Sequence, residues 1–168
     1  MVLSNMSRVP LISVALTSMV VLTGPAISQT LGPEAGWRLY QDEFGTRVEY
    51  PSELFSRESR PPAVGMGQSF TTPDRRAELS IYSFPNDQGV SPERYVRNNL
   101  TDPRSMLTYD RTTKRFFAVS MNKGDRILYK RCNFSGRTIH CINLEYPRQE
   151  KRAWDATVTR ISRSLRPL

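Results

Sequence analysis

The chain has 168 residues, of which 24 are Lys or Arg and 16 are Asp or Glu, giving a formal net charge of +8. One histidine and two cysteines are too few for a Cys/His metal site, so a structural zinc domain is excluded and no metal or cofactor is expected. The basic residues are scattered and lack an aromatic stacking platform, which argues against a nucleic-acid-binding protein.

Residues 1–28 have the pattern of a cleavable signal peptide. Arg8 provides the positive charge, residues 9–23 form a mostly apolar run, and Ala26-Ile27-Ser28 offers small residues to a signal peptidase. An apolar helix of this length rises only about 22 Å, against about 30 Å of membrane hydrocarbon, so we expect cleavage and no stable membrane span. Retention of the segment as an anchor is the alternative.

Residues 29–168 are expected to form a single globular domain. Because Arg8 is the only charged residue in the first 28, the mature net charge falls from +8 to +7. Such a charge favours anionic neighbours, and the signal places the domain outside the cytoplasm, most simply in the periplasm.

The first part of the mature chain has the pattern of short strands, expected at residues 37–40, 46–50, 66–72 and 76–83. Leu54-Phe55 is predicted to lie beneath the sheet, and residues 56–65 are predicted to be a loop. Ala77, Leu79 and Ile81 alternate with polar residues at the period of a half-buried strand.

A helix is predicted to begin at Ser91-Pro92-Glu93, which offers an N-cap hydroxyl, a proline in the first turn and an early acid, and to end before Pro103. Four strands are expected after it, near residues 106–111, 115–121, 125–134 and 137–146.

A closing helix is predicted at 148–165 after Pro147, with an apolar stripe formed by Trp154, Val158, Ile161 and Leu165. Nearly all strand connections are short. The predicted fold class is therefore α+β: a mostly antiparallel sheet of about six strands flanked by helices, with a long C-terminal amphipathic helix.

Cys132 and Cys141 are predicted to form a disulfide, because an even pair in an oxidising compartment most simply bridges. If they lie directly opposite each other on neighbouring strands, Tyr129 faces Leu144 on one largely apolar face of the hairpin. The face that carries the cysteines would then be largely polar and exposed to water.

The same register places Arg131 and His140 on the apolar face, where they could form a small anion-binding pocket. Alternatively, both lie near the strand ends and reach water. Arg148, Lys151 and Arg152 are a candidate docking face for an acidic partner, or simply part of a solvated helix surface of mixed charge.

The sequence contains no recognisable catalytic motif. The leading hypothesis is an exported, non-enzymatic binding or accessory module that docks onto anionic lipid, an acidic glycan or an acidic protein. The alternatives are an enzyme of unrecognised type with a pocket at the Cys132/Cys141 hairpin, and a purely structural envelope protein.

Four motifs span most of the mature chain: Gly45-Thr46…Tyr50-Pro51…Leu54-Phe55, Gly67-Gln68-Ser69-Phe70, Arg131-Cys132…His140-Cys141 and Trp154…Ile161-Ser162-Arg163-Ser164-Leu165. In these motifs the chain resembles a group of small, uncharacterised exported bacterial proteins, a resemblance that implies no activity. The Tyr-Pro followed by an apolar pair, two strands and a helix also resembles the PsbP-like α/β/α sandwich. That likeness implies a central antiparallel sheet flanked by helices, and no functional residues carry over from it.

Overall fold

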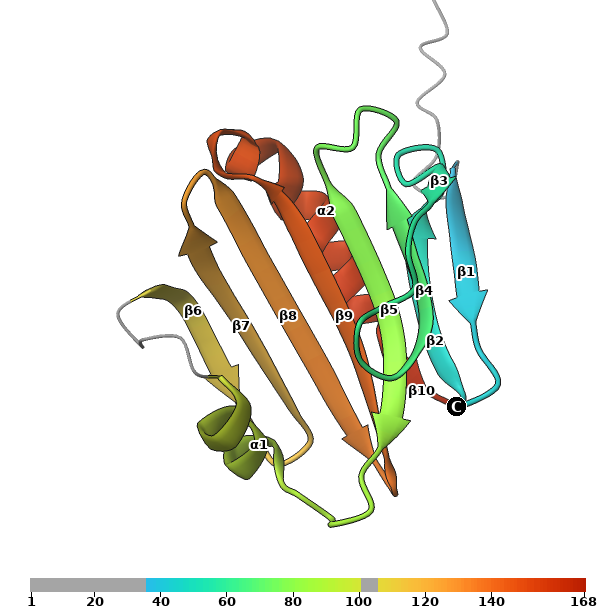
Figure 1. Ribbon diagram of the computed structural model, residues 1–168, viewed down its shortest axis with the longest axis vertical. Coiled ribbons are helices and arrows are strands. Elements are labelled where there is room, and N and C mark those ends of the chain that lie inside the picture. The colour runs from blue at the N-terminus through green and yellow to red at the C-terminus, as the bar shows by residue number, and fades with distance from the viewer. Residues whose placement is uncertain (1–35, 101–105) are drawn as a thin grey trace, which may run out of the picture. The chain divides into compact units, whose positions relative to one another are not determined.

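The computed structural model describes residues 36–100 and 106–168, which form two antiparallel β-sheets and two α-helices (Figure 1). The α+β class and the antiparallel pairing predicted from the sequence are confirmed. The predicted signal peptide, residues 1–28, lies outside the described residues.

The larger sheet has seven strands in the order β3-β4-β5-β9-β8-β7-β6. Their bounds are β3 (Arg57–Glu58), β4 (Met66–Thr71), β5 (Glu78–Pro85), β6 (Leu107–Thr112), β7 (Phe116–Lys123), β8 (Arg126–Ser135) and β9 (Thr138–Pro147). The predicted strands of this sheet are confirmed to within a few residues. The two-residue strand β3 lies within the segment predicted as a loop, and it is too short to produce a detectable hydrophobic period.

The smaller sheet has the order β1-β2-β10 and consists of β1 (Trp37–Gln41), β2 (Thr46–Pro51) and β10 (Arg166–Pro167). The larger sheet therefore has seven strands where about six were predicted, and the prediction did not include the separate three-stranded sheet. The pairing of β10 with β2 joins segments almost a whole domain apart in the sequence, so no local pattern encodes it.

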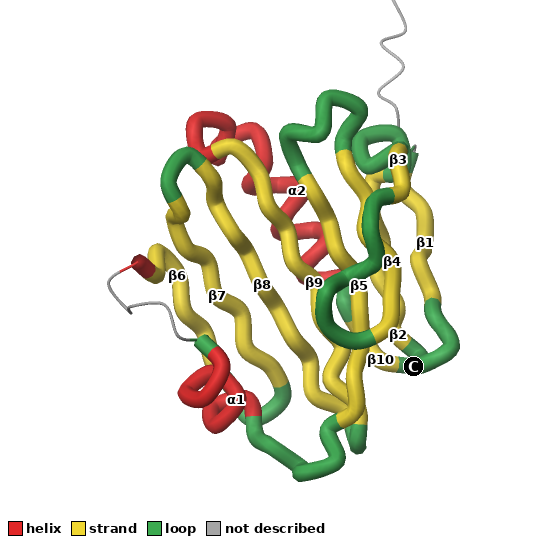
Figure 2. The backbone as a smooth tube through the Cα atoms, viewed as in Figure 1, coloured by secondary structure: helices red, strands yellow, loops and turns green. Residues whose placement is uncertain are grey.

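Helix α1 (Pro92–Asn99) begins where the capping pattern predicts, since the Ser91 hydroxyl accepts a hydrogen bond from the Arg94 backbone N–H at 3.3 Å. A 3₁₀ turn η2 (Arg148–Glu150) precedes helix α2 (Lys151–Ser164). Figure 2 shows this turn and helix as one continuous helical stretch after β9.

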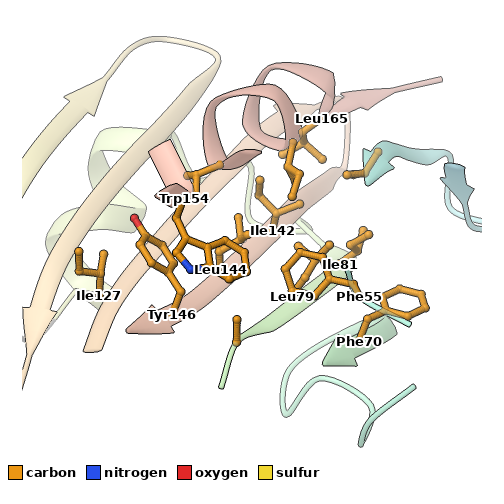
Figure 3. Close-up of a cluster of buried hydrophobic side chains, with 14 residues drawn as sticks. Phe55, Phe70, Leu79, Ile81, Ile127, Ile142, Leu144, Tyr146, Trp154 and Leu165 are labelled. Carbon is orange, nitrogen blue, oxygen red and sulfur yellow. The ribbon is translucent and has the colours of Figure 1, made fainter. Parts of the chain in front are cut away.

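The main core lies between the larger sheet, α2 and β2 (Figure 3). The predicted stripe on α2 is confirmed, because its four apolar residues Trp154, Val158, Ile161 and Leu165 are all buried. They contact a side of the sheet that we call the α2 face, which carries Leu79, Ile142 and Leu144. Phe55 is buried in this core, whereas Leu54 is 36% exposed, so only one residue of the predicted pair lies beneath the sheet.

The Cys132–Cys141 disulfide is present, and the predicted register of its hairpin is confirmed, with Cys132 opposite Cys141 and Tyr129 opposite Leu144. The prediction that the cysteine face is wet is wrong around the bridge. Both cysteines are fully buried in a second core with Phe117, on what we call the α1 face of the sheet. The cover comes from the neighbouring strands and from α1, so the hairpin's own residues do not reveal it.

Candidate functional site

A cleft of about 480 Å³ lies on the α2 face, between α2 and the outer strands β6, β7 and β8. Figure 1 shows α2 crossing behind β9 and β5 and leaving β6 and β7 without a helix behind them. The charged side chains that line the cleft are Arg111, Arg131, Lys151, Arg163 and Asp155. Four cations and one carboxylate give the cleft a net positive charge.

Strand register brings two of these arginines onto one face of the sheet. Arg111 on β6 lies opposite Ala118 on β7, and Ala118 in turn lies opposite Arg131 on β8. The two arginine backbones are thus two strand spacings apart, about 10 Å. Because Ala118 is small, both long side chains can extend over the central strand.

Both guanidinium groups lie against the ring of Phe116, with Cζ of Arg131 4.3 Å and Cζ of Arg111 5.5 Å from the ring centroid. Neither arginine forms an ion pair with a carboxylate within residues 36–100 and 106–168. Burial lowers the pKa of Arg131, and the charge of Arg111 acts in the same direction. Two cations are therefore held close together without a counterion in the part of the chain that the structure describes.

Hydrogen bonds from both ends of the guanidinium fix Arg131 in the cleft. Its Nε donates to Oδ1 of Asn133 at 3.0 Å, and its Nη1 donates to Oγ of Ser162 on α2 at 3.4 Å. The Tyr129 hydroxyl lies 2.6 Å from the same Ser162 oxygen, and burial raises the pKa of Tyr129. The base of the cleft is therefore a connected polar network that joins the sheet to α2.

Lys151 and Asp155 form an i,i+4 ion pair at the other end of the cleft, with 2.8 Å between Nζ and Oδ1. This pairing offsets the one carboxylate among the described residues of the lining. The unbalanced positive charge therefore belongs to Arg111, Arg131 and the exposed Arg163.

His140 does not join Arg131 in the cleft. It is 2% exposed, and its Nδ1 lies 2.9 Å from the Thr46 hydroxyl on β2. The alternative that His140 reaches water near a strand end is thus wrong, because β2 covers it. Asn133 separates the two residues of the predicted pocket, since it lies opposite His140 and accepts a hydrogen bond from Arg131.

The three residues of the candidate docking face also separate. Lys151 lines the cleft, whereas Arg148 and Arg152 are exposed and do not belong to its lining. Acidic side chains lie on the same helical stretch: Glu150 pairs with Arg76, and Asp155 pairs with Lys151. This arrangement matches the mixed-charge helix surface that was the alternative interpretation.

Sequence reasoning missed Arg111, Phe116 and Ser162 as cleft residues. A signal for Arg111 and Phe116 was present in the sequence. The strands β6 and β7 form a short hairpin in which Arg111 lies opposite Ala118, and Phe116, two positions before Ala118, shares its face. Ser162 carried none, since its position depends on where α2 lies across the sheet.

Neither α1 nor α2, the helices in the described ranges, is long and apolar enough to cross a membrane. Within the same ranges, no three His, Cys, Asp or Glu side chains come together as a group that could hold a metal ion.

No family model and no curated protein matches the chain. Among solved structures, it is similar to the solution structure of cyanobacterial PsbP (CyanoP) from Synechocystis sp. PCC 6803, with a TM-score of 0.58 and 13% sequence identity. The match covers 86% of this chain and 100% of that chain. At this identity the similarity shows the fold alone. The chain therefore has a PsbP-like fold.

Proposed function

We propose that the chain is an exported, non-enzymatic binding module that docks onto an acidic component of the cell envelope through the cleft between α2 and β6–β8. The partner carries phosphate, carboxylate or sulfate groups, as anionic lipids, acidic glycans and acidic proteins do. The proposal includes the kinship with small exported bacterial proteins that the sequence motifs indicate.

The single observation that supports it is the arginine pair on Phe116, without a carboxylate partner in the described residues. Two like charges on one ring repel each other, and the partial burial of Arg131 without a carboxylate partner is costly, whereas Arg111 is exposed. A bound anion would remove both costs. Guanidinium groups also match phosphate and carboxylate with paired hydrogen bonds, which favours those groups as the ligand.

Two features support the proposed location. The signal-like pattern of residues 1–28 predicts export, and the buried Cys132–Cys141 bridge suits an oxidising compartment such as the periplasm.

The test measures retention of the protein, purified after export, on vesicles with and without anionic phospholipid, on an acidic glycan and on an acidic peptide. The double variant Arg111→Gln, Arg131→Gln is compared with Arg38→Gln, Arg94→Gln, which removes the same charge from two exposed residues outside the cleft. We expect the cleft variant to bind at least about tenfold more weakly, since one hydrogen bond to a charged group contributes about 1.5–3 kcal/mol. The control variant should lose less than about twofold, as expected for screened surface charge.

Ionic strength provides a second measurement. Binding should weaken strongly between about 0.01 M and about 1 M salt, as the Debye length falls from about 30 Å to about 3 Å. Equal losses in both variants would mean that diffuse charge, and not the cleft, is responsible. Failure of all anionic probes to retain the protein at low salt would rule out the electrostatic proposal.

A further inference from the structure

A second cavity, of about 230 Å³, lies on the α1 face of the larger sheet, on the opposite side from the cleft. Lys130 on β8 and Asn143 on β9 line it together with apolar side chains that include Leu100 and Met121. For comparison, an engineered apolar cavity of about 150 Å³ binds benzene. The cavity on the α1 face is large enough for a small organic ligand.

Lys130 brings an unmatched positive charge to this cavity. Its Nζ lies 5.7 Å from the centroid of the Tyr95 ring and 6.0 Å from that of Tyr82. Among the described residues it has neither a hydrogen-bond acceptor nor a carboxylate partner. The side chain is half-buried, and burial lowers the pKa of Lys130. Ring faces offer an ammonium group attraction but no oxygen lone pair, so its N–H donors are available to a ligand.

Asn143 supplies a second donor beside the first. It lies directly opposite Lys130 in the β8–β9 pair, so the two side chains leave the sheet on the same face. Its Oδ1 accepts a hydrogen bond from the Tyr82 hydroxyl at 3.4 Å. This bond assigns the amide oxygen to Tyr82 and leaves the amide N–H groups for the cavity.

The remaining lining selects the kind of anion. Leu100, Met121 and Leu128 offer an apolar surface next to the two donors. Glu78 and Glu145 also belong to the lining, and Arg126 pairs with Glu145 but not with Glu78. The Glu78 carboxylate repels a ligand with two negative charges more strongly than a ligand with one, so a single negative charge that Lys130 can balance, on an apolar body, fits best.

We propose that this cavity binds a small apolar monocarboxylic acid as its anion. One carboxylate oxygen accepts from Lys130 Nζ and the other from the Asn143 amide, while the hydrocarbon part lies against Leu100, Met121 and Leu128. The site lies on the other face of the sheet from the arginine cleft and differs from it in selectivity, since the described lining of the cleft has no unpaired carboxylate.

Calorimetric titration of the purified protein with hexanoate, hexanol and inorganic phosphate tests this assignment. Hexanoate should bind at least about tenfold more tightly than hexanol, which has the same chain length and lacks the charge, and phosphate should not compete with it. Lys130→Met keeps most of the apolar stem and should weaken hexanoate binding at least about tenfold. Lys123→Met removes an exposed lysine at the end of β7 and should leave the affinity unchanged.

A measurement on the unaltered protein guards against a Lys130 variant that does not fold. On addition of hexanoate, the side-chain amide of Asn143 and the ring protons of Tyr95 should shift in the NMR spectrum. The proposal is overturned if the shifts map to the Arg111 and Arg131 side chains, if hexanol binds as tightly as hexanoate, or if phosphate displaces hexanoate.

Discussion

The imidazole of His140 is buried, and a side chain from a distant strand lies within hydrogen-bond distance of it. His140 is 2% exposed, and it forms a hydrogen bond with Thr46 on β2, which lies 94 positions earlier in the sequence. Burial lowers the pKa of His140, and the nearby Asp42 charge only partly opposes this shift. Because burial disfavours the imidazolium ion, protonation of this residue is coupled to unfolding.

We therefore expect the free energy of unfolding to fall as the pH is lowered from 7 to 5. In the unfolded chain histidine takes up its proton near pH 6.5, whereas in the folded protein it does so at a lower pH. Between these two pKa values the unfolded state binds more protons than the folded state. The contribution of His140 to stability is therefore fully present above the pKa of the unfolded chain and is lost as the pH falls through the pKa of the folded protein. One proton allows a slope of at most about 1.4 kcal/mol per pH unit.

Urea unfolding at several pH values measures this slope, with His140→Gln as the comparison. His140 is the only histidine in the chain, so the variant should be less dependent on pH over this interval. A variant that keeps the full slope would show that carboxylates cause it.

At the scale of elements, the β8–β9 hairpin organises both faces of the larger sheet. One face contributes Ile142 and Leu144 to the main core, and the other contributes Cys132 and Cys141 to the second core. The disulfide therefore fixes the register of a hairpin that has one core on each of its faces.

Replacing both cysteines with alanine should lower the free energy of unfolding by about 2.5–3 kcal/mol, because the cross-link closes a loop of about ten residues in the unfolded chain. Urea denaturation of the double variant measures the loss. Reduction of the unaltered protein provides the control. Because both cysteines are fully buried, a reductant should reach the bridge only after the protein unfolds. Equal denaturation midpoints with and without the bridge would contradict its structural role.

The β4–β5 pair depends on a glycine for close approach. A Cβ at Gly67 would lie 2.0 Å from the Ile81 carbonyl oxygen and 2.6 Å from the Tyr82 Cα. Both atoms belong to backbone, which cannot rotate away as a side chain could. Gly67→Ala should therefore lower the free energy of unfolding by about 1–3 kcal/mol. Gln68→Ala in the same strand is the matched control and should lower the free energy of unfolding by less. Thermal unfolding of both variants measures the difference, and equal losses would contradict the steric argument.

At the scale of the whole molecule, export and oxidation should appear together in the mature protein. Intact mass analysis of protein recovered from the native envelope should give a chain that begins at Gln29 and lacks two hydrogens relative to the free thiols. A chain that keeps residues 1–28 and two free thiols would contradict both the predicted signal and the oxidising compartment.

Local patterns predicted most of the fold. The α2 stripe and the β8–β9 register depend on neighbours within a few positions, so their periods are visible in the sequence. The separate β1-β2-β10 sheet and the His140–Thr46 contact join distant segments, and no period encodes them. The cleft itself was not predicted: the sequence named Arg131 and Lys151 as candidates in two different sites, and the arrangement of α2 over the sheet brings them into one lining.

The pairing of β10 with β2 has a consequence for the order in which the protein can assemble. Arg166 pairs with Arg47, and the Leu168 N–H donates to the Gly45 carbonyl at 2.8 Å, so residues 166–168 complete a sheet whose other two strands lie within residues 37–51. Until β10 has formed, the side of β2 that does not pair with β1 stays open. Contacts this distant in sequence form slowly, because the whole intervening chain must be looped. Closure of the small sheet is therefore a late event in folding, and until it occurs β2 keeps an unpaired strand edge that chaperones can recognise.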